Sequence, residues 1–252
     1  MAEDWFSTRG FDWHPHRGIE TITVVLEGEL EHHDNRGGRG ILKAGDVQWM
    51  TAGKSLLHSE MGYNKKPVHT LQLWVNLPAD KKMIEPRYHD LRRDQIPVRI
   101  EEGKGNGLEI IVFSGRSGNV KGPETVANHV PITMLDVIMK KEGALFTQEI
   151  PAGQEGFIFV LSGQGKFGKD KTSIKVGQIG HLSKTSKNEG PTNLTVTADE
   201  KSPSPLRFLL WTGQPLHQPV VAYGPFVMNT REQIDEAFTD YRNGVFGSIP
   251  NR

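Results

Sequence analysis

The sequence contains no cysteine, which excludes disulfide bonds, thiolate catalysis and zinc–thiolate sites. Neither sign of charge is in excess, because 30 lysine and arginine residues balance 30 aspartate and glutamate residues. Proteins that bind nucleic-acid phosphates usually carry a basic excess, so we expect no direct nucleic-acid contact. No run of about 18 apolar residues is present, so we expect no membrane span. Residues 1–10 lack the apolar stretch of a secretory signal, and we expect a cytoplasmic or nuclear protein.

Turn-forming residues are abundant instead, since 28 of the 252 residues are glycine and 15 are proline. This composition is typical of many short strands joined by tight turns. Residues 20–26 (ETITVVL) are rich in β-branched side chains and end at a turn signal, Glu27-Gly28. Residues 69–77 (HTLQLWVNL) alternate apolar and polar side chains, which is the period of a half-buried strand. We therefore predict an all-β chain.

Three short segments recur in the same order, about 135 residues apart, which indicates an internal duplication. The matching pairs are 25–28 (VLEG) with 160–163 (VLSG), 43–46 (KAGD) with 175–178 (KVGQ), and 73–74 with 210–211 (both LW). A boundary is expected near residues 115–130, which gives domains 1–115 and 130–252. Residues 230–241 have helical spacing with Thr230 as N-cap, so the second domain is expected to end in a short helix.

Two pairs of metal-capable side chains stand out, His14-Pro15-His16 and His58-Ser59-Glu60. Residues at i and i+2 of a strand point to the same face, so two neighbouring strands can aim three imidazoles and one carboxylate at one point. Imidazole and carboxylate together suit a redox-active first-row metal, Fe(II) above all, with coordination positions left open. We therefore predict a mononuclear metal site in the first domain. The matching positions of the second domain contain no histidine, so we expect no metal there.

Other polar residues near these motifs are open to two interpretations. Glu20 follows His16 by four residues and is either a further ligand or an acceptor that orients an imidazole. His32 and His33 are adjacent and face opposite sides of a strand, and we expect both to be exposed turn residues.

Several longer motifs resemble the pirin branch of the cupin superfamily and cover nearly the whole chain from Phe11 onward. They are residues 14–18 (HPHRG), 20–21 (ET), 45–53 (GDVQWMTAG), 57–61 (LHSEM), 71–77 (LQLWVNL), 85–88 (EPRY) and 224–230 (GPFVMNT). The resemblance implies a bicupin, which is two antiparallel β-sandwich (jelly-roll) barrels. It also implies one Fe(II) per chain, or another divalent first-row metal, held in the first barrel by the residues matching His14, His16, His58 and Glu60, and a second barrel without metal.

The resemblance further implies an oxidoreductase similar to quercetin 2,3-dioxygenases, with a flavonol or other small aromatic substrate and O2. Glu60 is then the catalytic base, because a metal ligand lies within reach of the substrate proton. The side chains expected to wall the aromatic pocket are Trp49, Met50, Leu71, Leu73 and Trp74.

Two alternatives stay open. The same family resemblance also implies a non-enzymatic, iron-dependent transcriptional coregulator that binds a transcription factor in the nucleus. A cupin without metal is the third reading. It follows from the start of the chain, where 13 residues precede His14 and the family has further strands. Residues 1–12 are therefore expected to be a replacement or a truncated start, and missing strands would expose a sheet edge.

Overall fold

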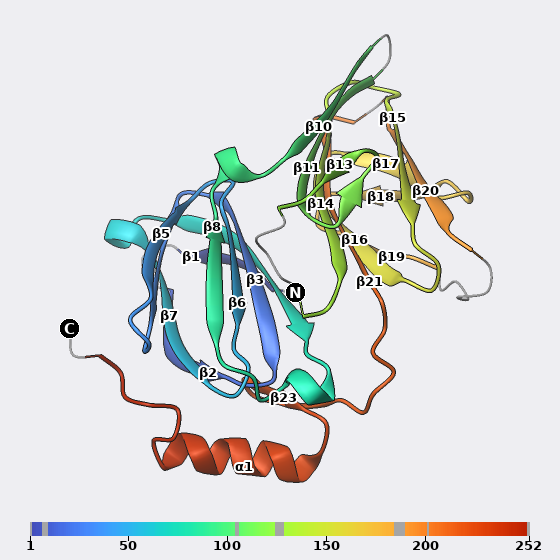
Figure 1. Cartoon of the computed structure of the whole chain (residues 1–252). Helices are drawn as coiled ribbons and strands as arrows, with labels where there is room; N and C mark the ends of the chain where they lie inside the picture. Colours follow the sequence, from blue (N-terminus) through green and yellow to red (C-terminus); the bar gives the residue numbers. More distant parts are fainter. Residues whose placement is uncertain are drawn as a thin grey trace. The chain divides into compact units, whose positions relative to one another are not determined.

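The computed structural model describes residues 2–6, 10–103, 106–123, 129–183, 190–200 and 202–250, with residues 2–6 and 106 described by their backbone alone. The chain divides into two compact units, Met1–Arg93 with Leu216–Arg252, and Asp94–Pro215. Figure 1 colours residues 1–93 of the first unit from blue to green and its C-terminal segment with the helix orange to red. Each unit is built from antiparallel sheets, which confirms the predicted all-β bicupin class.

The first unit contains a five-stranded and a four-stranded sheet that face each other. The larger sheet has the order β1 (Ala2–Phe6), β8 (Val68–Asn76), β3 (Ile19–Glu27), β6 (Val47–Thr51) and β9 (Arg87–Leu91). The smaller has the order β2 (Phe11–His16), β7 (Leu56–Gly62), β4 (Glu29–Asp34) and β5 (Arg39–Lys43). Short 3₁₀ turns occupy Tyr63–Lys65, Ala79–Lys81 and Arg93–Gln95.

The second unit repeats this plan around a continuous apolar core. Its larger sheet has the order β10 (Val98–Gly103), β11 (Asn106–Ser114), β14 (Ile132–Met139), β21 (Leu206–Gly213), β16 (Glu155–Ser162) and β19 (Ile179–His181). The smaller has the order β15 (Leu145–Ile150), β20 (Thr192–Ala198), β17 (Gln164–Phe167) and β18 (Thr172–Lys175), and β12 (Arg116–Ser117) pairs with β13 (Val120–Lys121). Residues of both sheets fill the space between them, among them Phe146, Ile158, Val196 and Phe208.

The C-terminal segment, Leu216–Arg252, belongs to the first unit. The predicted boundary at residues 115–130 had placed this segment in the second domain. The segment contains β22 (Val221–Tyr223), β23 (Phe226–Met228) and α1 (Arg231–Arg242). The helix begins at Thr230 in a capping box, as predicted, and buries Ile234 and Ala237. These side chains pack with Leu57 of β7, so the helix covers the first barrel. None of the helices in the described part of the chain has the length and apolar character needed to cross a membrane.

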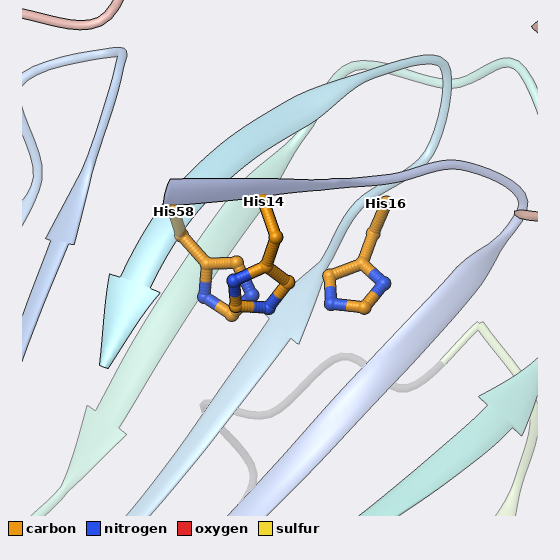
Figure 2. A group of neighbouring side chains, drawn as sticks. All are labelled: His14, His16 and His58. Atoms are coloured by element: carbon orange, nitrogen blue, oxygen red, sulfur yellow. The ribbon is translucent and has the colours of Figure 1, made fainter. Parts of the chain in front are cut away.

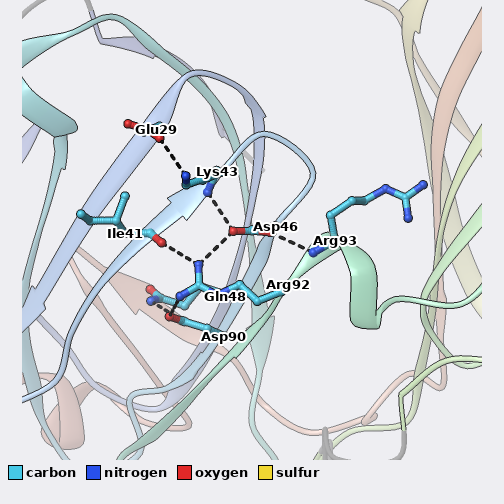
Figure 3. Close-up of polar contacts among 8 residues, drawn as sticks. All are labelled: Glu29, Ile41, Lys43, Asp46, Gln48, Asp90, Arg92 and Arg93. Carbon is cyan, nitrogen blue, oxygen red and sulfur yellow. Dashed lines mark hydrogen bonds and ion pairs between the residues drawn. The ribbon is translucent and has the colours of Figure 1, made fainter.

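The duplication is visible in backbone hydrogen bonds within each unit. Gly45 donates its N–H to the Val25 carbonyl at 2.8 Å, and Gly177 donates to the Val160 carbonyl at 2.8 Å. Both β3 and β16 shift register directly after that valine. In the first unit the turn is fixed by Asp46, which accepts the backbone N–H groups of Lys43 and Arg93 and a bond from Arg92, each at 2.9 Å (Figure 3).

The third predicted sequence match is one residue out of register. Trp74 pairs with Thr21, but Trp211 pairs with Phe157, the residue equivalent to Ile22 by the spacing of the duplicated valines. Because side chains alternate faces along a strand, this one-residue difference places the two tryptophans on opposite faces of their sheets.

Strand β1 extends the larger sheet beyond β8, with Ala2 opposite Gln72 and Phe6 opposite Val68. We expected an exposed sheet edge if N-terminal strands were missing. Strand β1 instead pairs with the edge of β8 along its whole length.

Candidate metal centre

Antiparallel pairing of β2 with β7 brings three of the four predicted ligands together. His14 lies directly opposite His58, and His16 shares their face because it follows His14 by two residues. The ring centroids lie 4.2 Å apart for His14 and His58, 4.9 Å for His14 and His16, and 5.0 Å for His16 and His58. Figure 2 shows the three imidazoles projecting into one space, and one nitrogen from each lies within 4.8 Å of the others.

Three buried ring nitrogens of His16 and His58 lack hydrogen-bond partners in the described part of the chain. His16 is 2% exposed and His58 is 0% exposed. Among the described residues, neither His16 Nε2 nor either ring nitrogen of His58 has a partner. The Nδ1 atoms of His14 and His16 lie 2.7 Å from the Asp12 carbonyl and 3.3 Å from the Pro225 carbonyl. Because a carbonyl oxygen only accepts, each Nδ1 carries a proton, and in the neutral ring Nε2 is then the atom with the free lone pair.

Burial keeps the imidazoles of His16 and His58 neutral. Burial, with the neighbouring His14, lowers the pKa of His16 to about 3. Burial also lowers the pKa of His58 well below its usual value. A metal requires the neutral form of the ring, so the electrostatics of the site match the needs of a metal ligand.

Glu60, the fourth predicted ligand, lies in the same barrel interior but is held by other groups. Glu60 is buried, with 2% of its surface exposed. Gln72 Nε2 donates to both carboxylate oxygens, at 3.2 and 3.0 Å, and the Thr23 hydroxyl donates at 3.3 Å. Glu60 forms a second metal-capable group with His32 and His58, whose ligand atoms lie within 4.8 Å of one another. His58 thus belongs to both groups.

The prediction that His32 is an exposed turn residue is wrong. His32 is 0% exposed and lies directly opposite Glu60 in the pairing of β4 with β7. Its ring centroid is 5.3 Å from that of His58. His33 is partly exposed and pairs with Glu31 at 3.0 Å, but it also lies in strand β4 and not in a turn. The alternation of strand residues 29–34 carried the signal, because it places His32 on the face of the apolar Leu30.

Glu20 does not join the histidines. Thr23, which contacts Glu60, marks the inner face of β3, and Glu20 is three residues away and therefore on the opposite face. Its carboxylate accepts a hydrogen bond from the Thr51 hydroxyl at 2.7 Å. Burial raises the pKa of Glu20, against the effect of that hydrogen bond.

Of the residues expected to wall the pocket, Met50 and Trp74 lie on the inner face, since both pair with Thr21. Trp74 is 40% exposed, and its ring lies 5.1 Å from that of His16. Trp49, Leu71 and Leu73 belong to the opposite face of the same sheet.

The strand registers also identify the equivalent positions in the second unit. In the pairing of β15 with β20, Gln148 lies opposite Leu194, as His14 lies opposite His58. In the pairing of β17 with β20, Phe167 lies opposite Val196, as His32 lies opposite Glu60. The equivalents of His14, His16, His58, Glu60 and His32 are therefore Gln148, Ile150, Leu194, Val196 and Phe167. Four of these five side chains belong to the apolar core.

The chain is similar to known proteins along most of its length. Residues 1–75 match the family described as Pirin, and residues 134–247 match the one described as Pirin C-terminal cupin domain. The chain is 41% identical to Pirin from Rattus norvegicus, over 94% of this chain and 78% of the relative.

Solved structures show the same likeness. A crystal structure named as quercetin 2,3-dioxygenase from Acinetobacter baumannii has a TM-score of 0.85 and 34% identity, and covers 99% of this chain and 84% of its own. A protein from Geobacillus kaustophilus has a TM-score of 0.78 and 46% identity, over 86% of this chain and 83% of its own. With two matching domain families in order and these relatives along its length, the chain belongs to the pirin family.

Proposed function

We propose that this chain holds one first-row divalent metal ion, Fe(II) in the first place, through His14, His16, His58 and Glu60. We propose further that it uses O2 to open the ring of a flavonol or a similar small aromatic substrate, in a reaction of the quercetin 2,3-dioxygenase type. The relative of that name from Acinetobacter baumannii supports the reaction class.

The observation that carries the metal assignment is the set of buried imidazole nitrogens without partners. A buried polar atom without a hydrogen bond is costly, and a folded protein retains such atoms where they serve another purpose. Three imidazole rings and a carboxylate on neighbouring strands fit a first-row metal, and leave coordination positions for other groups. When bound, the metal would act as a Lewis acid that favours the deprotonated substrate and brings it beside O2.

The residues of the barrel have separate tasks in this proposal. Glu60 accepts the proton of the substrate hydroxyl, a role open to a carboxylate that lies beside the substrate. Trp74, at the exposed side of the histidine cluster, offers an aromatic face to a flat substrate. Met50, on the inner face of the barrel, belongs to a buried apolar cluster and would help to exclude water from the site.

The test is iron content and oxygen uptake measured on the same anaerobically purified sample. We expect about one iron per chain and quercetin-dependent O2 uptake that a chelator abolishes. His58→Ala should lose most of the iron and the uptake, whereas His181→Ala, an exposed histidine of the second unit, should keep both. Equal losses in the two variants would contradict the assignment.

The second candidate function, an iron-dependent transcriptional coregulator that binds a transcription factor, uses the same four residues. Full iron occupancy without O2 uptake on quercetin would favour it over the dioxygenase. A failure to bind iron after reconstitution would contradict both functions and favour a cupin without metal.

A further inference from the structure

The carboxylate of Glu60 is the end point of a hydrogen-bonded chain that crosses the barrel interior. Gln72 reaches both of its oxygens through one amide nitrogen, and Thr23 donates to one of them. Gln72 also donates to the Thr23 hydroxyl at 3.1 Å, which fixes the two donors relative to each other. Glu60 is thereby held against the sheet that contains β3 and β8, although its own strand is β7 of the facing sheet.

The orientation of the Gln72 amide is set by Trp74. The indole N–H donates to Gln72 Oε1 at 3.0 Å. An amide has one oxygen and one nitrogen end, so a donor on its oxygen forces the nitrogen to point the other way, toward Glu60. Trp74 is 40% exposed and lies beside His16. The chain therefore runs from the exposed side of the histidine cluster to the buried carboxylate.

These bonds restrain the position of the Glu60 carboxylate relative to the histidines. Within the described residues, the ligand atoms of His14, His16 and His58 gather into one group, and the carboxylate of Glu60 gathers only with His32 and His58. Gln72 contacts both Glu60 oxygens, so a movement of the carboxylate toward His14 and His16 must lengthen charge-assisted hydrogen bonds.

At the matching positions of the second barrel, the described residues form no such hydrogen-bonded chain. By strand register, Ile158 and Leu210 stand where Thr23 and Gln72 stand in the first barrel. Val196 stands where Glu60 stands, and all three residues belong to the apolar core. The amide and hydroxyl donors thus occur in the barrel that has a carboxylate for them to hold.

We propose that Gln72 and Trp74 are positioning residues that hold the Glu60 carboxylate apart from the three histidines, and so set how readily it joins them around a metal. The inference rests on the proposed metal site. It predicts that weakening the chain makes Glu60 a better ligand. If instead these hydrogen bonds bring Glu60 toward the histidines, weakening the bonds would make Glu60 a poorer metal ligand.

The experiment uses Co(II), whose visible absorption reports the number and type of its ligands. We would titrate the metal-free full-length protein with Co(II) and compare wild type with Gln72→Leu and Trp74→Phe. We expect Gln72→Leu to bind Co(II) about tenfold more tightly, with an absorption change that is absent when Glu60→Gln is added to it. Trp74→Phe keeps the ring, lacks the N–H, and should shift affinity in the same direction by a smaller factor.

The matched control is Gln48→Leu. Gln48 lies on the same inner face, opposite Thr23 on the neighbouring strand, but its amide donates to Asp90 at 3.0 Å. The Gln48→Leu variant should bind Co(II) with the affinity of the wild type. Thermal unfolding of each metal-free variant identifies any that fail to fold, and Trp74→Phe, at an exposed position, provides the reading if Gln72→Leu does not fold.

Unchanged or weaker Co(II) binding in Gln72→Leu and Trp74→Phe would overturn the inference. The proposed metal site is tested separately by His58→Ala. If that variant binds Co(II) as wild type does, the metal site itself is wrong. If it loses Co(II) while the Gln72 and Trp74 variants match wild type, only the positioning role is wrong.

Discussion

At the scale of single residues, the inner face of β3 explains why the first barrel has a polar interior. Ile19 and Val25 belong to separate apolar clusters, and Thr21 and Thr23 lie between them on the same face. In β16 the position of Thr23 is taken by Ile158, part of a continuous core. A polar layer between two apolar clusters gives Glu60 its hydrogen-bond partners, at the cost of apolar packing.

The low pKa of His16 makes the stability of the metal-free protein depend on pH. In the unfolded chain the ring takes a proton as pH falls through about 6.5, whereas the buried ring in the folded state stays neutral down to about 3. The unfolded state then binds more protons, so stability is full above about pH 6.5 and is lost below it. We expect a contribution of about 2 kcal/mol to be lost between pH 7.5 and pH 5.

The measurement is urea unfolding of the chelator-treated protein at both pH values, for wild type and His16→Gln. The difference between the two proteins isolates His16 from Glu20, whose raised pKa acts in the opposite direction. The same pH dependence in both proteins would contradict the neutral, buried state of His16.

At the scale of strands, spacing alone predicted part of the site. The i, i+2 pairs on β2 and β7 were readable from sequence because face alternation is local. The positions of His32, Gln72 and Thr23 beside Glu60 depend on how strands far apart in the chain are paired. The residue pattern of a single strand does not determine that pairing. The same limit explains the out-of-register match of Trp74 with Trp211 and the assignment of Glu20 as a ligand or an orienting acceptor.

The duplicated turns allow a matched pair of substitutions. Asp46 accepts three hydrogen bonds in the first unit, whereas its equivalent Gln178 accepts one, from Lys175 N–H at 3.0 Å. Because bonds to a charged acceptor are the stronger ones, we expect Asp46→Ala to destabilise the protein by about 3 kcal/mol and Gln178→Ala by about 1 kcal/mol or less. Urea unfolding of both variants is the measurement. Equal losses would show that Asp46 does not fix its turn.

At the scale of the whole molecule, sequence predicted two β-sandwich units with a C-terminal helix, and the helix lies with the first unit. The stripe of Ile234 and Ala237 showed that the helix has an apolar face, but not which barrel that face covers. The answer comes from long-range contacts, including the ion pair of Arg17 with Asp240 at 2.9 Å and the bond from Asn35 to the Phe246 carbonyl at 2.7 Å.

The proposed metal site gives a whole-molecule prediction for stability. A metal that binds only the folded first unit should stabilise it by about 2.7 kcal/mol at a free concentration of 100 times the dissociation constant. Thermal unfolding with Fe(II) under anaerobic conditions, and again after chelation, measures this. The increase should be absent in His14→Ala. An equal increase in wild type and in that variant would show that the metal binds elsewhere.

The most direct test of the central claim is anomalous X-ray diffraction at the iron edge, from crystals grown anaerobically with Fe(II). The account predicts one strong anomalous peak per chain, within bonding distance of His14, His16 and His58, with Glu60 turned toward it. A peak away from the three histidines, or none at full iron supply, would contradict the assignment of this barrel as a metal site.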